Sequence, residues 1–456
     1  MTKKSISDNL SEQQNSLAVQ PINKLFMHMA MPMMIGMIIN GLYNLVDAFF
    51  VSRFIGSNAM AAVSIVFPLQ MVIIALATMV SNGASILVSQ YLGANQSAKV
   101  SSVIHAAVRI IIIFTVLIAI TSILLNQMLL QVLYVPEVLR TSVNDYFLPL
   151  ALGGILIFTL SLSTDLLRAQ GRMNILFIGI LVSAIANVIF DWLFIVVFDW
   201  GISGAAIATL SAQFIGCVIG LVYFFEQIPR RKFFVQSNLF DITIVRQIFV
   251  LGSPVLLQYI GAALIIGIIN GLVAASVDNN AHWLSAYGII GRFNIFIILP
   301  LIAMTNASQT IISFNYGRGS TERVRQALLH GLKANVKYLS IMACMLLIIP
   351  EALLSVLTSD KVIIDTGAKI ARMMFILLPL AGISSMTIAY FQGVGKAKQA
   401  LILTMTKVYI LIIPLLLFIN IMWGYKNLWY AFPVADIVTL ALASYLFLCL
   451  RKKNLD

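Results

Sequence analysis

The feature that most constrains this chain is a series of long apolar runs with only short polar intervals between them. A helix that crosses a bilayer needs about 20 mostly apolar residues, whereas a helix on the surface of a soluble protein keeps a polar face. Charged residues make up 10% of the 456 residues, and 60% are hydrophobic. A soluble domain carries roughly 25% charged residues. The sequence therefore predicts an all-α integral membrane protein with about twelve transmembrane helices.

The apolar runs form two sets of six, which predicts two bundles. The longest polar interval after the N-terminal segment, residues 226–248, is expected to be a cytoplasmic linker between them. We expect an N-terminal six-helix bundle at 30–225, a C-terminal six-helix bundle at 249–450, and short tails at 1–29 and 451–456. The expected spans are 30–52, 60–88, 102–125, 145–165, 174–198, 204–225, 249–276, 284–314, 327–350, 368–391, 400–422 and 428–450.

The distribution of basic residues predicts the orientation of the chain. Loops on the side of both termini hold most of the Lys and Arg residues, and the opposite loops hold only Arg53, Arg140, Lys361, Lys369 and Lys426. Cytoplasmic loops carry the excess of basic residues in membrane proteins. The first twenty residues lack the apolar core and cleavage site of a signal peptide. We therefore expect a multi-pass protein of the plasma membrane, the bacterial cytoplasmic or inner membrane, with both termini in the cytoplasm.

The two halves resemble each other when the sequence is displaced by about 222 to 224 positions, as after an internal duplication. Three matches occur in order along the chain: Pro32 with Pro254, SQYLGAN at 89–95 with SFNYGRG at 313–319, and RAQGRMN at 168–174 with YFQGVGK at 390–396. Because each copy has six spans, both keep one orientation, which predicts a pseudo-twofold axis along the membrane normal and a central cleft between the bundles. Rocking of the bundles would give alternating access to that cleft.

Composition and spacing argue against several classes of function. The net charge of +12 comes from basic residues in ones, twos and threes rather than a continuous stripe, so nucleic-acid binding is not expected. Cys217, Cys344 and Cys449 are isolated in apolar stretches, and the four His residues have no partner spacing, so no disulfide, metal site or cofactor is expected. No nucleophile with a nearby base lies within a span, so we do not expect an enzyme.

Acidic residues inside the spans are the candidate functional groups. A charged carboxylate at the centre of a membrane helix costs about 2.5 to 3.5 kcal/mol, so it calls for a partner or a function. Asp47 in the first span and Asp191 in the fifth qualify. Two neighbouring carboxylates would titrate as a coupled pair, and the same oxygens equally suit a small hard cation. A structural carboxylate bonded to a neighbouring helix is the alternative for each.

Other polar residues fall at helical spacing around these two. Residues three, four and seven apart share one face of a helix. The first helix carries such a face, with Asn40, Asn44 and Asp47 in line and Tyr43 beside them. The fifth and sixth helices carry i, i+4 pairs, which are Asn187 with Asp191 and Thr209 with Gln213. Convergence of the three faces would form one polar site in the N-terminal bundle.

Three motifs resemble the multidrug and toxic compound extrusion (MATE) family, over roughly residues 25 to 450. LYNLVDAFFVSRFIG at 42–56 resembles the family's first-helix signature, and Pro32 matches a helix-bending proline of some members. ANVIFDWLFI and GISGAAIAT resemble the fifth helix and the start of the sixth. The resemblance implies export of amphipathic, often cationic compounds, driven by protons or sodium ions. It also implies a coupling-ion site formed by Asp47, Asn187, Asp191 and Thr209, with Asn40, Tyr43, Asn44 and Gln213 as a second shell or part of the substrate cleft.

The chain departs from the sodium-coupled branch of that family in its second half. Where those relatives carry a Glu four positions after a Gln, this chain has Gln258 followed by Ala262, and Ser384 and Ser385 lie near the place of an Asp in the tenth helix. The sequence therefore resembles the DinF-like branch, in which the N-terminal Asp carries the coupling.

Several interpretations stay open from the sequence. A flippase of lipid-linked or polysaccharide substrates, from the same superfamily, is the alternative function, although such a cleft should be strongly basic. Arg292, Lys407 and Asp436 lie within spans and either pair structurally, reach the interface or line the cleft. Met residues crowd the start of the first helix, as packed surface or as an adaptable substrate surface. The two internal copies make a functional monomer in contact with membrane lipid sufficient.

Overall fold

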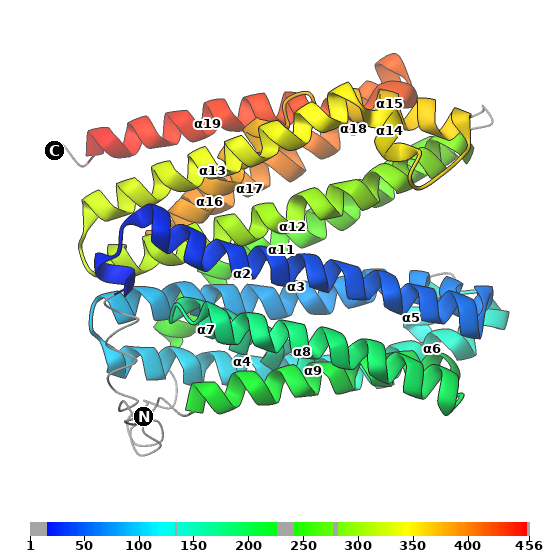
Figure 1. The fold of residues 1–456 in the computed structure, drawn as a ribbon, viewed down its shortest axis with the longest axis horizontal. Coiled ribbons are helices and arrows are strands. Elements are labelled where there is room, and N and C mark those ends of the chain that lie inside the picture. The colour runs from blue at the N-terminus through cyan, green and yellow to red at the C-terminus, as the bar shows by residue number, and fades with distance from the viewer. Residues whose placement is uncertain (1–15, 133–134, 226–240, 277–280, 454–456) are drawn as a thin grey trace. The chain divides into compact units, whose positions relative to one another are not determined.

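The computed structural model describes residues 16–132, 135–225, 241–276 and 281–453, and every regular element in these ranges is a helix (Figure 1). The α-helices are α2 (Ile22–Phe50), α3 (Ser57–Gly93), α4 (Ser97–Leu124), α5 (Asn126–Val132), α6 (Glu137–Leu152), α7 (Gly154–Ala169), α8 (Met173–Asp191), α9 (Gly201–Phe225), α11 (Ile242–Ala274), α12 (Ala281–Gly317), α13 (Thr321–Ile348), α14 (Pro350–Leu354), α15 (Lys361–Phe375), α16 (Leu378–Gly393), α17 (Ala397–Met405), α18 (Ile413–Trp423) and α19 (Ala431–Lys453). Shorter segments are the π-helices η1 (Val51–Ile55), η2 (Trp192–Val197) and η3 (Thr406–Ile412) and the 3₁₀-helix η4 (Tyr425–Tyr430).

Within the described residues, 10 helices are long and apolar enough to cross a membrane, and the number is 12 when each of two bent helix pairs counts as one span. The expected fourth and tenth spans are these bent pairs: α6 meets α7 at 49°, and α15 meets α16 at 48°. Proline explains the breaks, because it lacks an N–H and cannot continue a helical ladder. Pro149 lies in the last turn of α6, and Pro379 lies in the first turn of α16. The prediction of an all-helical membrane fold is confirmed.

By compactness the chain divides into two units, Met1–Leu256 with Ser313–Ser320, and Leu257–Ile312 with Thr321–Asp456. The expected bundle boundaries stay a prediction, because α11 and α12 each contribute residues to both units. Each unit has a buried core and apolar outer faces. In the second unit Trp429 is fully buried, whereas Ile348 and Ile421 are more than two-thirds exposed. Apolar side chains on the outside fit a lipid environment rather than water.

The helix bounds repeat along the chain at a displacement of 224 residues. The two ends of α3 and α12 correspond, from 57 to 281 and from 93 to 317, and so do those of α4 and α13, from 97 to 321 and from 124 to 348. The bent pairs also correspond, because α6 begins at 137 and α15 at 361, and α7 ends at 169 and α16 at 393. A common displacement over consecutive helices is what a duplicated unit leaves, so the structure confirms the internal repeat.

Four helix ends share one cap and correct the register of one predicted match. Each has a residue with positive φ two positions beyond the helix, namely Asn95, Gly171, Gly319 and Gly395. The next N–H then bonds the carbonyl five residues back, as from Arg172 to Leu167 at 2.9 Å, which is the Schellman cap. Gly395, not Gly393, is therefore the counterpart of Gly171. The predicted match of RAQGRMN with YFQGVGK was wrong by two residues, because the sequence alone does not show which glycine is left-handed.

Two glycines in the first unit allow the ends of α3 and α12 to cross closely. A Cβ at Gly93 would collide with the carbonyl of Phe314, and a Cβ at Gly317 would collide with the carbonyl of Gln90. The two contacts exchange residues that lie 224 positions apart, since 90 corresponds to 314 and 93 to 317. Such reciprocity is expected where two copies of one unit meet about a local twofold axis.

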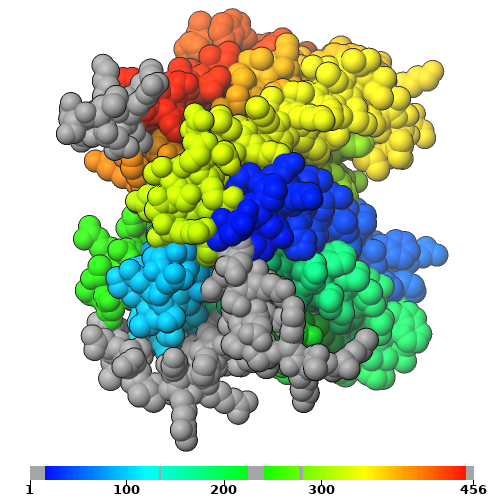
Figure 2. All heavy atoms as spheres, turned by 60° about the vertical axis from the view of Figure 1, so that its left-hand side comes forward, coloured from blue at the N-terminus to red at the C-terminus, as the bar shows by residue number. Residues whose placement is uncertain are grey.

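The residues before α2 pack against the end of α12 in the first unit. Leu17 is buried, its carbonyl accepts from the Asn315 amide at 3.4 Å, and the Ala18 carbonyl accepts from the Arg318 guanidinium at 2.9 Å. Val19, next along the chain, is exposed, and the blue start of the described chain lies at the surface in Figure 2. The segment expected to be a tail, 1–29, thus contains packed helix from Ser16 onward; residues 1–15 lie outside the described part.

Candidate functional site

Asp47 and Asp191 each lie beside a π-helical segment of the first unit. Asp47 is one turn before η1, and Asp191 is the last residue of α8, directly before η2. In these segments the bonds reach back five residues, from the Gly56 N–H to the Val51 carbonyl at 3.1 Å and from the Phe198 N–H to the Leu193 carbonyl at 2.9 Å. π-helices are rare and frequently occur at functional sites. η1 and η2 contact each other, so the segments that follow the two carboxylates lie side by side.

The polar atoms of this cluster are buried without protein partners. Among the described residues, both carboxylate oxygens of Asp191, both polar atoms of the Asn187 amide and Oδ1 of Asp47 have no hydrogen-bond partner. Asp191 is fully buried and Asn187 is 2% exposed. Asp191 lies close enough to Asp47 for the two carboxyl groups to interact electrostatically. Desolvation of an unpaired carboxylate costs several kcal/mol, so the cluster calls for protons or a bound cation.

Helix α9 places the predicted sixth-helix residues at the level of Asn187. The Ser183 hydroxyl donates to the Ala212 carbonyl at 2.8 Å, and Gly204 packs against the Phe194 carbonyl, so α8 and α9 run antiparallel. Counting one turn onward from Ser183 puts Asn187 level with residue 208 of α9. Thr209 is therefore near Asn187, although its hydroxyl donates to the carbonyl of Ala205 at 3.2 Å.

Gln213, one turn further along α9, also has an unsatisfied group. Its buried Oε1 lacks a hydrogen-bond partner among the described residues. The amide follows Ala212, the residue whose carbonyl Ser183 contacts, so Gln213 lies about one turn from the level of Asn187. Its oxygen is thus available to a ligand or a water at the margin of the cluster.

Two tyrosines complete the electrostatic surroundings, and only one of them was predicted. Tyr43 of α2 and Tyr146 of α6 both interact electrostatically with Asp47 and with Asp191. Tyr146 is buried, and the nearby Oδ1 of Asn144 is buried without a partner among the described residues. No spacing rule links α6 to α2 or α8, so the sequence gave no signal for Tyr146 beyond its polar hydroxyl within an apolar run.

The remaining first-helix residues lie at the edge of this cluster. Asn40 and Asn44 are exposed, and the Asn44 amide donates to the Asn40 carbonyl at 2.7 Å and to its side-chain oxygen at 3.2 Å. Pro32 lies inside α2, which is assigned as one helix from Ile22 to Phe50, so the predicted bend there stays a prediction.

The donor atoms of the cluster are mainly oxygens, which suits hard ligands. No group of three or more His, Cys, Asp or Glu that could hold a metal ion occurs among the described residues. Two carboxyl groups, amide oxygens and phenol hydroxyls are the ligand types that protons and small hard cations use. The cluster is therefore chemically able to exchange a proton or to bind a monovalent cation.

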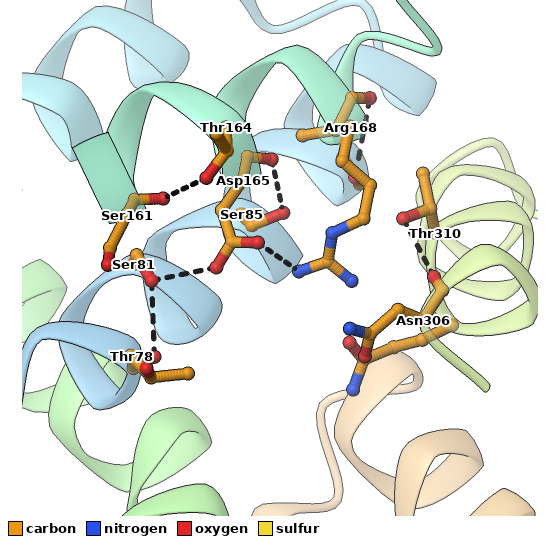
Figure 3. A network of polar contacts seen from close by, with 12 residues as sticks. Thr78, Ser81, Ser85, Ser161, Thr164, Asp165, Arg168, Asn306 and Thr310 are labelled. Atoms are coloured by element: carbon orange, nitrogen blue, oxygen red, sulfur yellow. Dashed lines mark hydrogen bonds and ion pairs between the residues drawn. The ribbon is translucent and has the colours of Figure 1, made fainter. Parts of the chain in front are cut away.

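A different buried acid joins α3 and α7 in the same unit (Figure 3). The Arg168 guanidinium donates to Oδ1 of Asp165 at 2.9 Å, and the Ser81 hydroxyl donates to Oδ2 at 2.7 Å. The Ser85 hydroxyl donates to the Asp165 backbone carbonyl at 2.8 Å. Both carboxylate oxygens of Asp165 are thus partnered, in contrast to those of Asp191. The sequence analysis missed this pair, although its i, i+3 spacing of acid and base was a usable signal.

The second unit lacks the acids that the sodium-coupled branch carries. Ala262 is exposed on α11, and the Ser384 hydroxyl donates to the Leu380 carbonyl at 3.2 Å within α16. Arg292 is exposed on α12. Lys407 and Asp436, whose roles the sequence left open, form an ion pair at 2.6 Å.

The sequence pattern of the MatE family matches residues 32–193 and 254–418, which together make up most of the chain. The chain belongs to the MatE family. Members of this family are transporters, so the chain is a transporter rather than an enzyme.

Related proteins support the assignment over nearly the whole length. The multidrug export proteins MepA of Staphylococcus aureus (strain bovine RF122 / ET3-1) and of Staphylococcus haemolyticus (strain JCSC1435) are each 22% identical to this chain; they align over 95% of it and over 95% and 94% of their own lengths. Among solved structures, an outward-facing multidrug resistance MATE family transporter of the MOP superfamily has a TM-score of 0.87 at 23% identity, covering 100% of this chain and 99% of that chain. A MOP superfamily transporter from Pyrococcus furiosus, described as having a binding pocket of reverse polarity, has a TM-score of 0.86 at 23% identity, with 99% and 98% covered. The fold is therefore that of MATE transporters.

Proposed function

We propose that this chain is a secondary active multidrug exporter of a bacterial cytoplasmic membrane, which extrudes amphipathic, often cationic compounds in exchange for protons or sodium ions. The observation that carries the proposal is the buried cluster of Asp47, Asn187 and Asp191, whose polar atoms have no protein partners in the described part of the chain. The MepA relatives, described as multidrug export proteins, support the substrate class. Assignment to the DinF-like branch stays a prediction.

The coupling step follows from the cost of a buried negative charge. An ion or proton that neutralises Asp47 and Asp191 lowers that cost, so the loaded and unloaded forms of the first unit differ in their preferred packing. We assign Asp47, Asn187, Asp191 and Thr209 to the coupling-ion site. Asn40, Tyr43, Asn44 and Gln213 then surround it or line the substrate cleft, and Pro32 provides a bend of α2. Alternating access needs only this one chain, so a monomer suffices.

The available ion gradients supply enough free energy for such exchange. One proton that enters down about 100 mV gains about 2.3 kcal/mol. A gradient of one pH unit adds about 1.4 kcal/mol. At about 1.4 kcal/mol per tenfold, one-to-one exchange sustains a neutral substrate gradient of a few hundredfold.

The test is uptake of ethidium, a fluorescent cationic dye, into everted membrane vesicles under proton and sodium gradients imposed separately. The variant is Asp47→Asn, which removes the charge and keeps the shape of the side chain. Asp199→Asn is the matched control, because Asp199 is exposed and has a φ of 52°, a conformation that Asn adopts as readily as Asp. We expect the intact chain and the control to transport the dye with one of the two gradients and Asp47→Asn to lose that transport at equal membrane expression.

Each other outcome has a definite meaning. Normal transport by Asp47→Asn would show that Asp47 is structural and would refute the assigned coupling site. Absence of dye transport by the intact chain under both gradients would refute multidrug export and favour the flippase alternative, for which fluorescent lipid-linked substrates are the next assay.

A further inference from the structure

The ion pair of Lys407 and Asp436 lies where charges are most costly in a membrane protein. Lys407 is near the middle of the candidate span Ala397–Trp423, and Asp436 is equally far from both ends of Tyr425–Phe447. Their side chains are 21% and 10% exposed, and Nζ lies 2.6 Å from Oδ1. Ionisable residues at this depth are rare and mark substrate or ion pathways. A buried ion pair is also weak evidence for a stabilising role, since apolar replacement is often neutral or favourable.

The first unit shows that the same helix contact does not need an ion pair. At the displacement of 224 residues, Lys407 corresponds to Ser183 and Asp436 to Ala212, because α17 begins at 397 and α8 at 173, and η4 begins at 425 and α9 at 201. Ser183 and Ala212 contact each other directly, through one hydrogen bond from hydroxyl to backbone carbonyl at 2.8 Å. A single neutral bond therefore holds this contact in one copy of the repeat. The charges in the second copy call for another explanation.

The pair also has unused donors that point to a ligand. An ammonium group has three N–H donors, and the described residues give Lys407 one polar partner, Asp436. Thr404, three residues before Lys407 and hence on the same side of the helix, is 1% exposed, and its hydroxyl has no hydrogen-bond partner among the described residues. Lys407 is part of the π-helix η3, a type of segment enriched at functional sites. An ammonium and a hydroxyl with free donors, side by side, match the acceptors of a carboxylate.

We propose that Lys407 and Thr404 form a binding site for the carboxylate of zwitterionic amphipathic substrates, with Asp436 holding the ammonium in place between transport cycles. The proposal deepens the proposed multidrug export, on which it rests. It adds carboxylate-bearing compounds to the cationic ones and assigns their recognition to the second unit. Transfer of the ammonium from Asp436 to a substrate carboxylate replaces one charged contact with another, so binding leaves no buried charge without a partner.

The test compares two dyes that differ in one group, a rhodamine with a free carboxylate and its methyl ester. Uptake of both into everted vesicles is measured for the intact chain and for the double variant Lys407→Ser with Asp436→Ala, which recreates the contact of the first unit and removes both charges together. We expect unchanged transport of the ester and about a tenfold rise in the half-maximal concentration of the carboxylate dye, which corresponds to about 1.4 kcal/mol. Thr404→Val keeps the side-chain shape and is expected to affect only the carboxylate dye.

Two further variants separate recognition from structure. Asp436→Asn keeps the ammonium and is expected to transport the carboxylate dye at least as well as the intact chain. Arg372→Gln with Glu351→Gln removes an exposed ion pair of the same unit, with side chains 46% and 44% exposed, and is expected to change neither dye. Equal changes for both dyes in the double variant, no change for either, or intact chain that transports the ester but not the carboxylate dye would each overturn the inference. If the intact chain transports neither dye, multidrug export itself is refuted and the inference with it.

Discussion

The Asp165–Arg168 pair gives a quantitative prediction about stability. Asp165→Asn keeps the shape of the side chain but removes the carboxylate that neutralises Arg168, whose side chain is 2% exposed. Removal of one partner from a buried pair costs about 3 to 5 kcal/mol. Asn retains one acceptor oxygen and Asp165 is 19% exposed, so we expect a value near the lower end, about 3 kcal/mol. Ser81→Ala, which removes one hydrogen bond to the same carboxylate, should cost about 1 kcal/mol.

The assay is thermal unfolding of the purified protein in detergent, followed by the fraction that stays monodisperse. At about 2 to 4 °C per kcal/mol for a large domain, Asp165→Asn should lower the midpoint by about 6 to 12 °C. The double variant Asp165→Asn with Arg168→Met removes both charges and should recover most of the loss. Asp199→Asn, the same substitution at an exposed site, should leave the midpoint unchanged.

Two results would refute the reasoning about this pair. If Asp165→Asn were as stable as Asp199→Asn, the ionic contact would contribute nothing measurable. If the double variant were no more stable than the single one, the loss would come from the hydrogen bonds of Ser81 and Ser85 with Asp165 rather than from an uncompensated charge on Arg168.

Three further predictions follow from the first unit. Gly93→Ala and Gly317→Ala should each lower the thermal midpoint strongly, since the added Cβ meets a backbone carbonyl, whereas Gly267→Ala, with open space around it, should have no effect; equal midpoints would contradict the close crossing. Tyr146→Phe should raise the ion concentration for half-maximal ethidium transport by about tenfold, as expected for loss of a hydrogen bond to a charged group, and an unchanged value would separate Tyr146 from the site. Asn95→Ala should lower stability by about 1 kcal/mol because of its φ of 55°, while Asn95→Gly should not, and equal effects of the two would refute the cap.

The sequence predicted the parts of this fold that depend on composition along one helix. Span number and the internal repeat follow from the length and order of apolar runs, which hydropathy measures directly. The pairing of Asn187 with Asp191 follows from helical spacing. The bends at Pro149 and Pro379 were missed, because an apolar run can be long enough for one span whether or not it is straight.

Contacts between distant helices were beyond the reach of spacing rules. Tyr146 meets Asp47 and Asp191 only through the packing of three helices. Lys407 and Asp436 lie on different helices, so the sequence left open whether they pair. The π-helical segments beside these residues have no hydropathy signature, and only the backbone of the folded chain reveals them.

The repeat also shows that the two halves have diverged in their charges. At the displacement of 224 residues, the positions of Asp47 and Asp191 correspond to Gly271 and Leu415, so the second unit has lost or never had the unpartnered acids. The first unit in turn has no ion pair at the place of Lys407 and Asp436. One unit thus holds acids that only a proton or cation can neutralise, and the other holds a pair that is neutral by itself. This difference favours a division of tasks, in which ion loading acts through the first unit and recognition of charged substrate groups acts through the second.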